Sequence, residues 1–211
     1  GGWGAIPTGK NLAMTLFDLL DFDIKANPKY GSEKKGQPTT YYLSAAPEPI
    51  RLNCEYHYVD VVMSPDPHVF SHSNPLGGLT KGGSFVIQSE TSDAAKLWES
   101  FPESARRYIV DNDIHVYFLD GFKIAREEAT NPELQFRMQG NAFQGAFFCG
   151  IATDGTGQAG RGRPVQCNRQ TAAKQIRRQG RTHRAGQPAR GPSRLRRNPR
   201  DRRQDTGKQG G

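Results

Sequence analysis

A polar segment at residues 27–40, NPKYGSEKKGQPTT, holds the densest group of side chains able to bind an anion. Lysines neutralise a phosphate or carboxylate, and nearby hydroxyl and amide groups hydrogen-bond its oxygens. The candidate binding residues are Tyr30, Ser32, Lys34, Lys35 and Gln37. The same composition is also typical of a solvated loop with surface lysines, so both interpretations stay open.

The opening segment, GGWGAIPTGK at residues 1–10, is a second candidate: a glycine-rich turn that leads into a helix. Backbone N–H groups at a helix N-terminus can cradle an anion, here with Gly1, Gly2, Gly4 and Lys10. The segment is not a Walker loop, because its spacing differs and no Ser or Thr follows the lysine. The strand expected before such a turn is absent, and tight packing of the helix without a ligand explains the glycines equally well.

Other patterns of catalytic or metal-binding residues are missing. The four histidines between residues 57 and 115 have no acidic or thiolate partner at ligand spacing. The three cysteines form no CxxC motif, and no G-x-S-x-G elbow occurs. We therefore expect no metal and no catalytic residue in this chain.

The elements that must position these segments alternate between helix and strand patterns. Strands are predicted at 39–46, 50–56, 58–64, 82–89 and 114–120, and helices at 9–20, 104–111, 121–129 and 132–148. In the first helix, Leu12, Leu16, Phe17 and Leu20 have helical spacing. The strands at 58–64 and 82–89 are nearly continuous apolar runs, as in strands buried on both faces. The alternation favours an α/β fold, a three-layer Rossmann-like sheet flanked by helices, with ligands at the carboxyl ends of the strands.

The charge of the chain is divided at about residue 150. Residues 1–150 hold 13 Lys and Arg against 18 Asp and Glu, a net charge of −5, whereas residues 151–211 hold 16 against 3, a net charge of +13. The second part contains no Phe, Trp or Tyr, so it cannot bury enough apolar surface to offset the entropy of ordering. We expect an α/β domain at 1–149 and a disordered, basic, low-complexity tail at 150–211.

No run of 18 apolar residues and no charged-then-apolar leader occurs in the sequence. The cysteines do not form a disulfide framework either. We expect a chain that does not enter a membrane and that works in the reducing cytoplasm.

Several segments together resemble a known family. GGWGAIPTGKNLA, YGSEKKGQPTTYYL, VDVVMSPDP, LDGFKIA and MQGNAFQGAFF follow one another over residues 1–149. They are similar to the gamma subunit, or gamma domain, of the 2-oxoacid:ferredoxin oxidoreductases, of which pyruvate:ferredoxin oxidoreductase is a member. The motifs identify the family but not the particular 2-oxoacid.

The resemblance implies that this chain is one subunit of an oxidoreductase and that the subunit is inactive alone. The family converts a 2-oxoacid and coenzyme A to acyl-coenzyme A and carbon dioxide, with thiamine diphosphate, and passes electrons through iron–sulfur clusters to ferredoxin. This chain is expected to bind none of these cofactors by itself. It would act with alpha, beta and delta-type subunits and face their shared active site through the turn at Gly1, Gly2 and Gly4 and the loop at Tyr30, Ser32, Lys34 and Lys35. There the lysines would meet coenzyme A phosphates or the substrate carboxylate.

The family ends in helix where this chain has its basic tail, and a shifted reading frame explains the difference. With the frame moved one nucleotide later, the codons of residues 180–201 are compatible with GERIVQDNLRVVRRGFDEIREI, an amphipathic helix. Residues 150–156 likewise allow ASPLMEQ. Our hypothesis is a frameshift in the gene or its sequence at about residue 150, and a genuine disordered extension is the alternative.

Two other functions remain open from the sequence. The chain can be a nucleic-acid-binding protein that acts through its basic tail, although no aromatic side chain is present there for base stacking. It can also be a dinucleotide-binding Rossmann domain, but no acidic residue follows a strand about 20 positions after the glycines.

Overall fold

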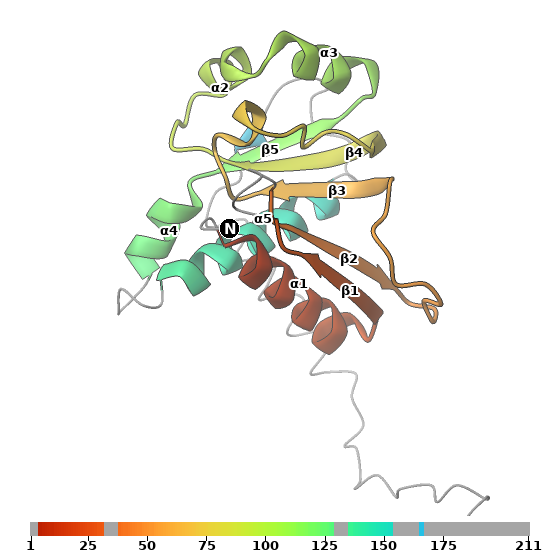
Figure 1. Ribbon diagram of the computed structural model, residues 1–211. Coiled ribbons are helices and arrows are strands. Elements are labelled where there is room, and N and C mark those ends of the chain that lie inside the picture. The colour runs from red at the N-terminus through yellow and green to blue at the C-terminus, as the bar shows by residue number, and fades with distance from the viewer. Residues whose placement is uncertain (1–3, 32–37, 129–134, 154–164, 167–211) are drawn as a thin grey trace, which may run out of the picture.

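The structure, a computed structural model, describes residues 4–31, 38–128, 135–153 and 165–166 of the 211-residue chain. The order of elements is α1 (Ala5–Leu20), β1 (Asp23–Lys29), β2 (Thr40–Ala46), β3 (Val59–Ser64), η2 (Val69–Ser71), β4 (Leu79–Gln88), α2 (Ala94–Ser100), α3 (Glu103–Asp111), β5 (His115–Leu119), α4 (Gly121–Glu128), α5 (Gln135–Thr153) and β6 (Val165–Gln166). A parallel sheet of order β3-β4-β5-β6 forms the centre, and β1 and β2 form a separate antiparallel pair. Helices lie on both faces of the parallel sheet (Figure 1), which confirms the predicted α/β class.

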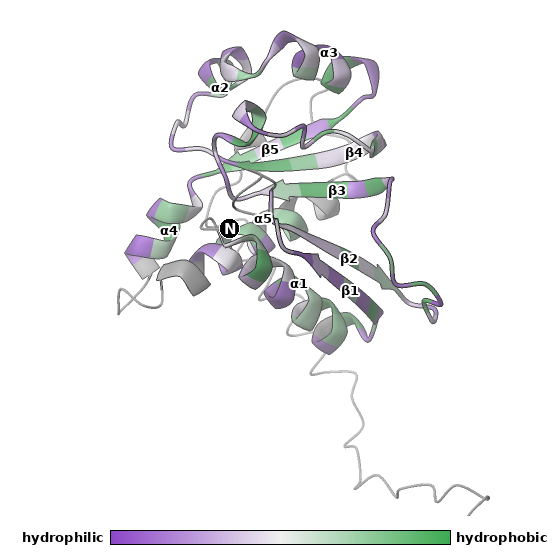
Figure 2. Cartoon of the chain, in the orientation of Figure 1, coloured by the Kyte–Doolittle hydropathy of each residue, from purple (hydrophilic) through white to green (hydrophobic). Residues whose placement is uncertain are grey.

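The central strands β4 and β5 are buried because helices cover both of their faces. The last six residues of β4 and the last four of β5 are all buried, and apolar residues dominate this part of the sheet in Figure 2. Strands covered on both sides read as continuous apolar runs, which is why these two were visible in the sequence.

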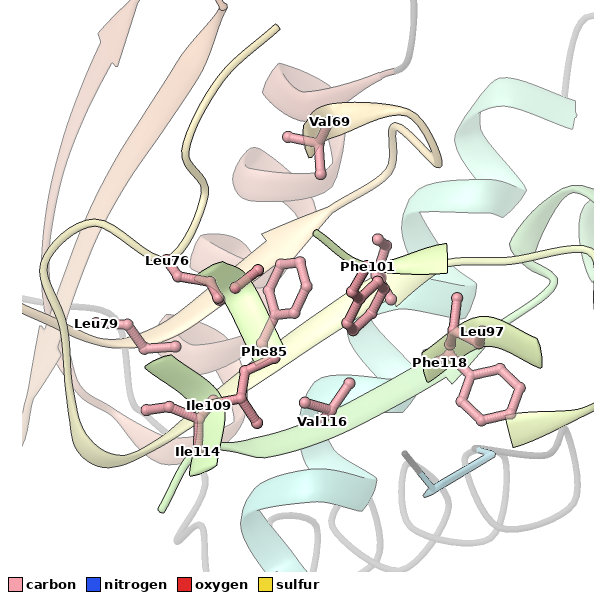
Figure 3. Close-up of a cluster of buried hydrophobic side chains, with 12 residues drawn as sticks. Val69, Leu76, Leu79, Phe85, Leu97, Phe101, Ile109, Ile114, Val116 and Phe118 are labelled. Atoms are coloured by element: carbon pink, nitrogen blue, oxygen red, sulfur yellow. The ribbon is translucent and has the colours of Figure 1, made fainter. Parts of the chain in front are cut away.

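The α2–α3 face of the sheet carries the largest apolar cluster (Figure 3). Phe85 from β4 and Phe118 from β5 pack against Phe101 and Ile109, which come from the end of α2 and from α3. Tyr108 on α3 donates its hydroxyl to the Leu79 carbonyl at 2.9 Å, which ties the helix to the start of β4. This cluster fills the core on the side of the sheet away from the candidate binding segments.

The opposite face is covered by α5, which lies between the sheet and α1. Val86 and Tyr117 of the sheet contact Phe143 and Ala146 of α5. Further along α5, Phe148 packs with Leu12 and other apolar residues of α1 and the β1–β2 pair. Figure 1 shows α1 and β1–β2 side by side at this end of the molecule. α1 is therefore held against the core mainly by α5, and Met63 of β3 also packs against this cluster.

One predicted strand is wrong, and two strands, β1 and β6, were not predicted. Residues 50–56 form no strand but an exposed connection, in which the Ile50 amide donates to Asp23 Oδ2 at 2.6 Å. The partner of β2 is instead β1, with register Lys29↔Thr40 at one end and Asp23↔Ala46 at the other. β1 reads DIKANPK, with weak strand propensity, and Pro28 fits because this strand lies at an edge.

Two predicted burial patterns also need correction. β3 is mostly half-buried, with Asp60 exposed and only Ser64 buried, because within the described residues it is an edge strand with a neighbour on one side only. On α1, Leu12 and Leu16 are buried as expected, but Phe17 is 56% exposed and Leu20 38%. A helix packed along one stripe buries positions four apart, and Phe17 lies beside that stripe, whereas Leu20 continues it but is the last residue of the helix.

The segment from residue 150 onward is described only in part. α5 continues to Thr153, and β6 pairs in parallel with β5 through Tyr117↔Val165 and Phe118↔Gln166. The rest of the expected basic tail lies outside the described residues. None of the described helices is both long and apolar enough to cross a membrane.

Candidate anion-binding end of the molecule

The β1–β2 pair brings the predicted polar loop to the start of α1. Residues 30–39 connect the two strands, beyond the last strand pair Lys29↔Thr40. Next to that pair, the ring of Tyr41 lies directly against Gly9 of α1, where a Cβ atom would overlap the ring. Only glycine permits this approach, so Gly9 sets where the base of the loop sits on the helix.

The burial of Tyr41 also has an electrostatic consequence. Desolvation raises the pKa of the Tyr41 hydroxyl, with a smaller contribution from Tyr30. Tyr30, the first residue of the loop, follows Lys29, and Lys29 pairs with Thr40 beside Tyr41. The side chain of Tyr30 itself is 69% exposed and is therefore available to a ligand or partner.

An ion pair holds the other side of the loop base. Lys29 Nζ lies 2.6 Å from Glu55 Oε2, which joins the end of β1 to the connection between β2 and β3. The hydrogen bond that Lys29 donates to Glu55 raises the pKa of Lys29, and the charge of Glu55 adds to the shift. Because both side chains are about half-exposed, the pair orients the loop more than it stabilises the fold.

The start of α1 rests on α5 along a polar seam. Gly4 precedes the helix in the left-handed conformation, with φ of 79°, and a Cβ there would lie 3.6 Å from Gln139 Oε1. One turn on, the helices touch so closely that a Cβ on Gly140 would lie 3.4 Å from Thr8 Cα. Gln144 then hydrogen-bonds the Thr15 hydroxyl. The opening turn is thus seated against α5.

The carboxyl ends of β4 and β5 carry a second polar group beside α5. Gln88, which is 1% exposed, accepts a hydrogen bond from the Gly121 amide at 2.9 Å and donates to Asp120 Oδ1 at 3.1 Å. Asp120 also accepts from the Lys123 amide at 2.9 Å and so caps α4. A Cβ on Gly121 would lie 3.2 Å from the ring of Phe143, one turn after Gln139. This edge is where ligands of parallel sheets bind.

Two of the predicted site residues, Tyr30 and Gly4, are described, and the structure places both at this end of the molecule. The others, Gly1, Gly2, Ser32, Lys34, Lys35 and Gln37, lie outside the described residues. What the structure brings together is the base of the loop and the start of α1, through Tyr41 and Gly9.

Sequence reasoning missed Gln139, Gln88 and Tyr41. Gln139 and Gln88 are polar residues inside apolar segments, MQGNAFQGAFF and FVIQS, and both are at most 2% exposed. A glutamine at a buried position of a helix or strand was the available signal, because burial of an amide requires a partner. No pattern pointed to Tyr41, because its contact with Gly9 depends on the tertiary fold.

The described residues at this end of the molecule offer hydrogen-bond donors and acceptors. Among them, no three His, Cys, Asp or Glu side chains gather as a metal site would require. His72 Nε2 lies 2.7 Å from Asp66 Oδ2 after the end of β3, a pair that was not predicted. Amide groups, a helix start and a loop base can bind and orient an acceptor-rich group by hydrogen bonds.

Comparison with known proteins agrees with this fold. Residues 1–154 match the family model described as pyruvate ferredoxin/flavodoxin oxidoreductase. The pyruvate-flavodoxin oxidoreductase of Klebsiella pneumoniae is 27% identical over 144 residues, which are 68% of this chain and 12% of that protein. The pyruvate/ketoisovalerate oxidoreductases common subunit gamma of Thermococcus litoralis is 29% identical over 111 residues, 53% of this chain and 60% of that one.

Among solved structures, pyruvate oxidoreductase subunit PORC from Thermotoga maritima is similar with a TM-score of 0.48 and 14% identity, over 87% of this chain and 89% of that chain. The chain spans about an eighth of the length of its Klebsiella relative and about three fifths of the Thermococcus subunit. Because the family model matches well over half of its residues, the chain belongs to the pyruvate ferredoxin/flavodoxin oxidoreductase family.

Proposed function

We propose that this chain is the gamma component of a 2-oxoacid:ferredoxin oxidoreductase that acts on pyruvate or a related 2-oxoacid. The observation that carries the proposal is the meeting of the base of the 30–39 loop with the start of α1, through Tyr41 and Gly9, in a member of this family. Both segments are suited to oxygen-rich ligands, and coenzyme A and 2-oxoacids are such ligands.

The described residues do not fit thiamine diphosphate or an iron–sulfur cluster. The only described cysteine side chain is the exposed Cys54, and the described residues gather no metal-binding group. In the proposed enzyme these cofactors are held by alpha, beta and delta-type subunits, which carry the decarboxylation and electron transfer to ferredoxin. This chain is then inactive alone.

The start of α1 and the composition of the 30–39 loop fit a supporting role toward coenzyme A. The anionic phosphates and amide groups of coenzyme A match the amide donors at the start of α1 and the lysines at positions 34 and 35 of the sequence. The Lys29–Glu55 pair and the Tyr41 contact would hold the loop so that it closes the coenzyme A side of the active site.

Reconstitution with the partner subunits tests this function. The full chain, added to alpha, beta and delta-type subunits, is expected to restore pyruvate-dependent reduction of ferredoxin and formation of acetyl-coenzyme A. A Glu55→Gln variant should assemble normally and raise the KM for coenzyme A about two- to fivefold, because the loop base loses an exposed ion pair. Activity of the other subunits that does not depend on this chain would contradict the proposal.

A further inference from the structure

Gln139 is the one buried side chain on α5 whose amide the described residues leave without a hydrogen bond. It is 2% exposed, and neither its Nε2 nor its Oε1 has a partner within the described part of the chain. A buried amide without partners is costly, so native proteins almost always supply one. The unpaired amide of Gln139 therefore indicates that a ligand or partner group binds beside it.

Gln139, a residue of α5, lies close to the N-terminal end of α1. Its Oε1 is 3.6 Å from the position of a Cβ on Gly4, the residue that precedes the helix. Gly4 has no side chain to cap the helix, and by helix geometry the amide groups of Ala5 and Ile6 have no acceptor within it. The amide of Gln139 and the unpaired N–H groups of the first turn of α1 therefore lie near one another, at the positive end of the α1 dipole.

The rest of the α1–α5 seam is satisfied, which sets Gln139 apart. Gln144, on the same helix and against the same partner helix, donates to the Thr15 hydroxyl. Asn11 Nδ2 lies 3.4 Å from Asn141 Oδ1 between them. Only the end of the seam at the opening turn keeps an unused amide, so the seam as a whole is not simply a poorly paired interface.

We propose that Gln139 and the start of α1 form a subsite for an anionic oxygen group, a phosphate or a carboxylate. Gln139 Nε2 and the first amide groups of α1 donate to its oxygens, and Oε1 accepts from a hydroxyl, amide or water that accompanies it. This deepens the proposed function and rests on it, because coenzyme A phosphates and the 2-oxoacid carboxylate are the two sources of such a group.

The test compares Gln139→Met with the matched control Gln144→Met in the full chain. Methionine keeps the volume and flexibility of glutamine but removes its hydrogen bonds. Binding of inorganic pyrophosphate, and separately of pyruvate, is measured by calorimetric titration, and the melting temperature of each variant is measured without ligand.

The two variants should show opposite behaviour. Gln139→Met should bind anion about tenfold more weakly, since it loses hydrogen bonds to a charged group, while its melting temperature stays equal or rises because an unpaired amide is removed. Gln144→Met should melt at a lower temperature and bind as the unaltered chain does. Pyrophosphate binding assigns the subsite to a phosphate, and pyruvate binding assigns it to a carboxylate.

Equal anion affinity in the unaltered chain and Gln139→Met would overturn the inference, as would binding of neither probe by the unaltered chain. A lower melting temperature for Gln139→Met with unchanged affinity would make Gln139 a structural residue. These measurements do not test assembly with partner subunits. The proposed function is therefore tested separately, by reconstitution.

Discussion

At the scale of single residues, Gly9 determines how the hairpin is placed on α1. In the interior of a helix, Gly→Ala normally stabilises by about 0.5–1 kcal/mol. Here the new methyl group would overlap the Tyr41 ring, and overpacking costs about 1–3 kcal/mol. Gly9→Ala should therefore lower the free energy of unfolding in urea. Gly77→Ala is the control, since a Cβ there meets Asn74 Nδ2 at an unstrained 3.4 Å. Equal stability of the two variants would contradict the close contact.

The raised pKa of Tyr41 predicts that the folded chain loses stability in alkaline solution. Burial raises the pKa of its hydroxyl, so above about pH 10 the folded chain retains a proton that the unfolded chain releases. Stability then falls as pH rises, and the raised pKa of Lys29 acts in the same direction. Tyr41→Phe should show a smaller decrease in the urea midpoint between pH 9 and pH 11. An identical decrease in both proteins would mean that Tyr41 ionises as it does in the unfolded chain.

At the scale of elements, Gln88 joins the end of β4 to the start of α4. Gln88→Leu leaves the Gly121 amide without its acceptor in a buried position, which costs about 1–3 kcal/mol of unfolding free energy. Thr80→Val, in the same strand, removes only an exposed hydrogen bond to Asp60 and should change stability by less than about 0.5 kcal/mol. The comparison is made by urea unfolding, and similar losses in both variants would mean that the amide network does not hold α4.

The elements predicted from the sequence are those whose own residues determine their burial. β4 and β5 appear as apolar runs and α3 as a short amphipathic pattern, because the apolar residues of each pack against the core. β1 could not be found from the sequence, because a strand at the edge of a hairpin needs no apolar run. DIKANPK forms a strand by pairing with β2. The 50–56 segment alternates like a strand but has no neighbour to pair with among the described residues. For the same reason, the sequence predicted the loop and the turn as binding segments but not the Gln139 and Tyr41 contacts, which arise only when α5 and β2 reach α1.

At the scale of the whole molecule, the acidic and basic parts of the chain are expected to behave as separate units. We propose that a frameshift produced the residues from about position 150 onward, and the family match ends nearby, at residue 154. DNA sequencing across codons 140–211, with mass spectrometry of peptides from the natural protein, should reveal a one-base discrepancy and peptides of the shifted frame. Peptides that match residues 167–211 as printed would show the basic segment to be genuine.

Deletion of residues 167–211 separates the proposed enzyme function from binding to nucleic acid. These residues hold 14 Lys and Arg against 2 Asp, a net charge of +12. The shortened chain should lose any salt-sensitive retention of nucleic acid, because phosphate contacts depend on lysine and arginine. It should keep its association with partner subunits, measured by size-exclusion chromatography. Loss of that association would place the partner contact in the deleted segment.

The most direct measurement is affinity purification of the tagged chain from its own cells, followed by mass spectrometry and cofactor analysis. We expect that larger subunits co-purify in fixed ratio with this chain and that they carry thiamine diphosphate and iron–sulfur clusters. The complex should reduce ferredoxin when pyruvate or a related 2-oxoacid and coenzyme A are added. A chain that purifies alone, or with nucleic acid released by salt and lost on deletion of residues 167–211, would contradict this expectation.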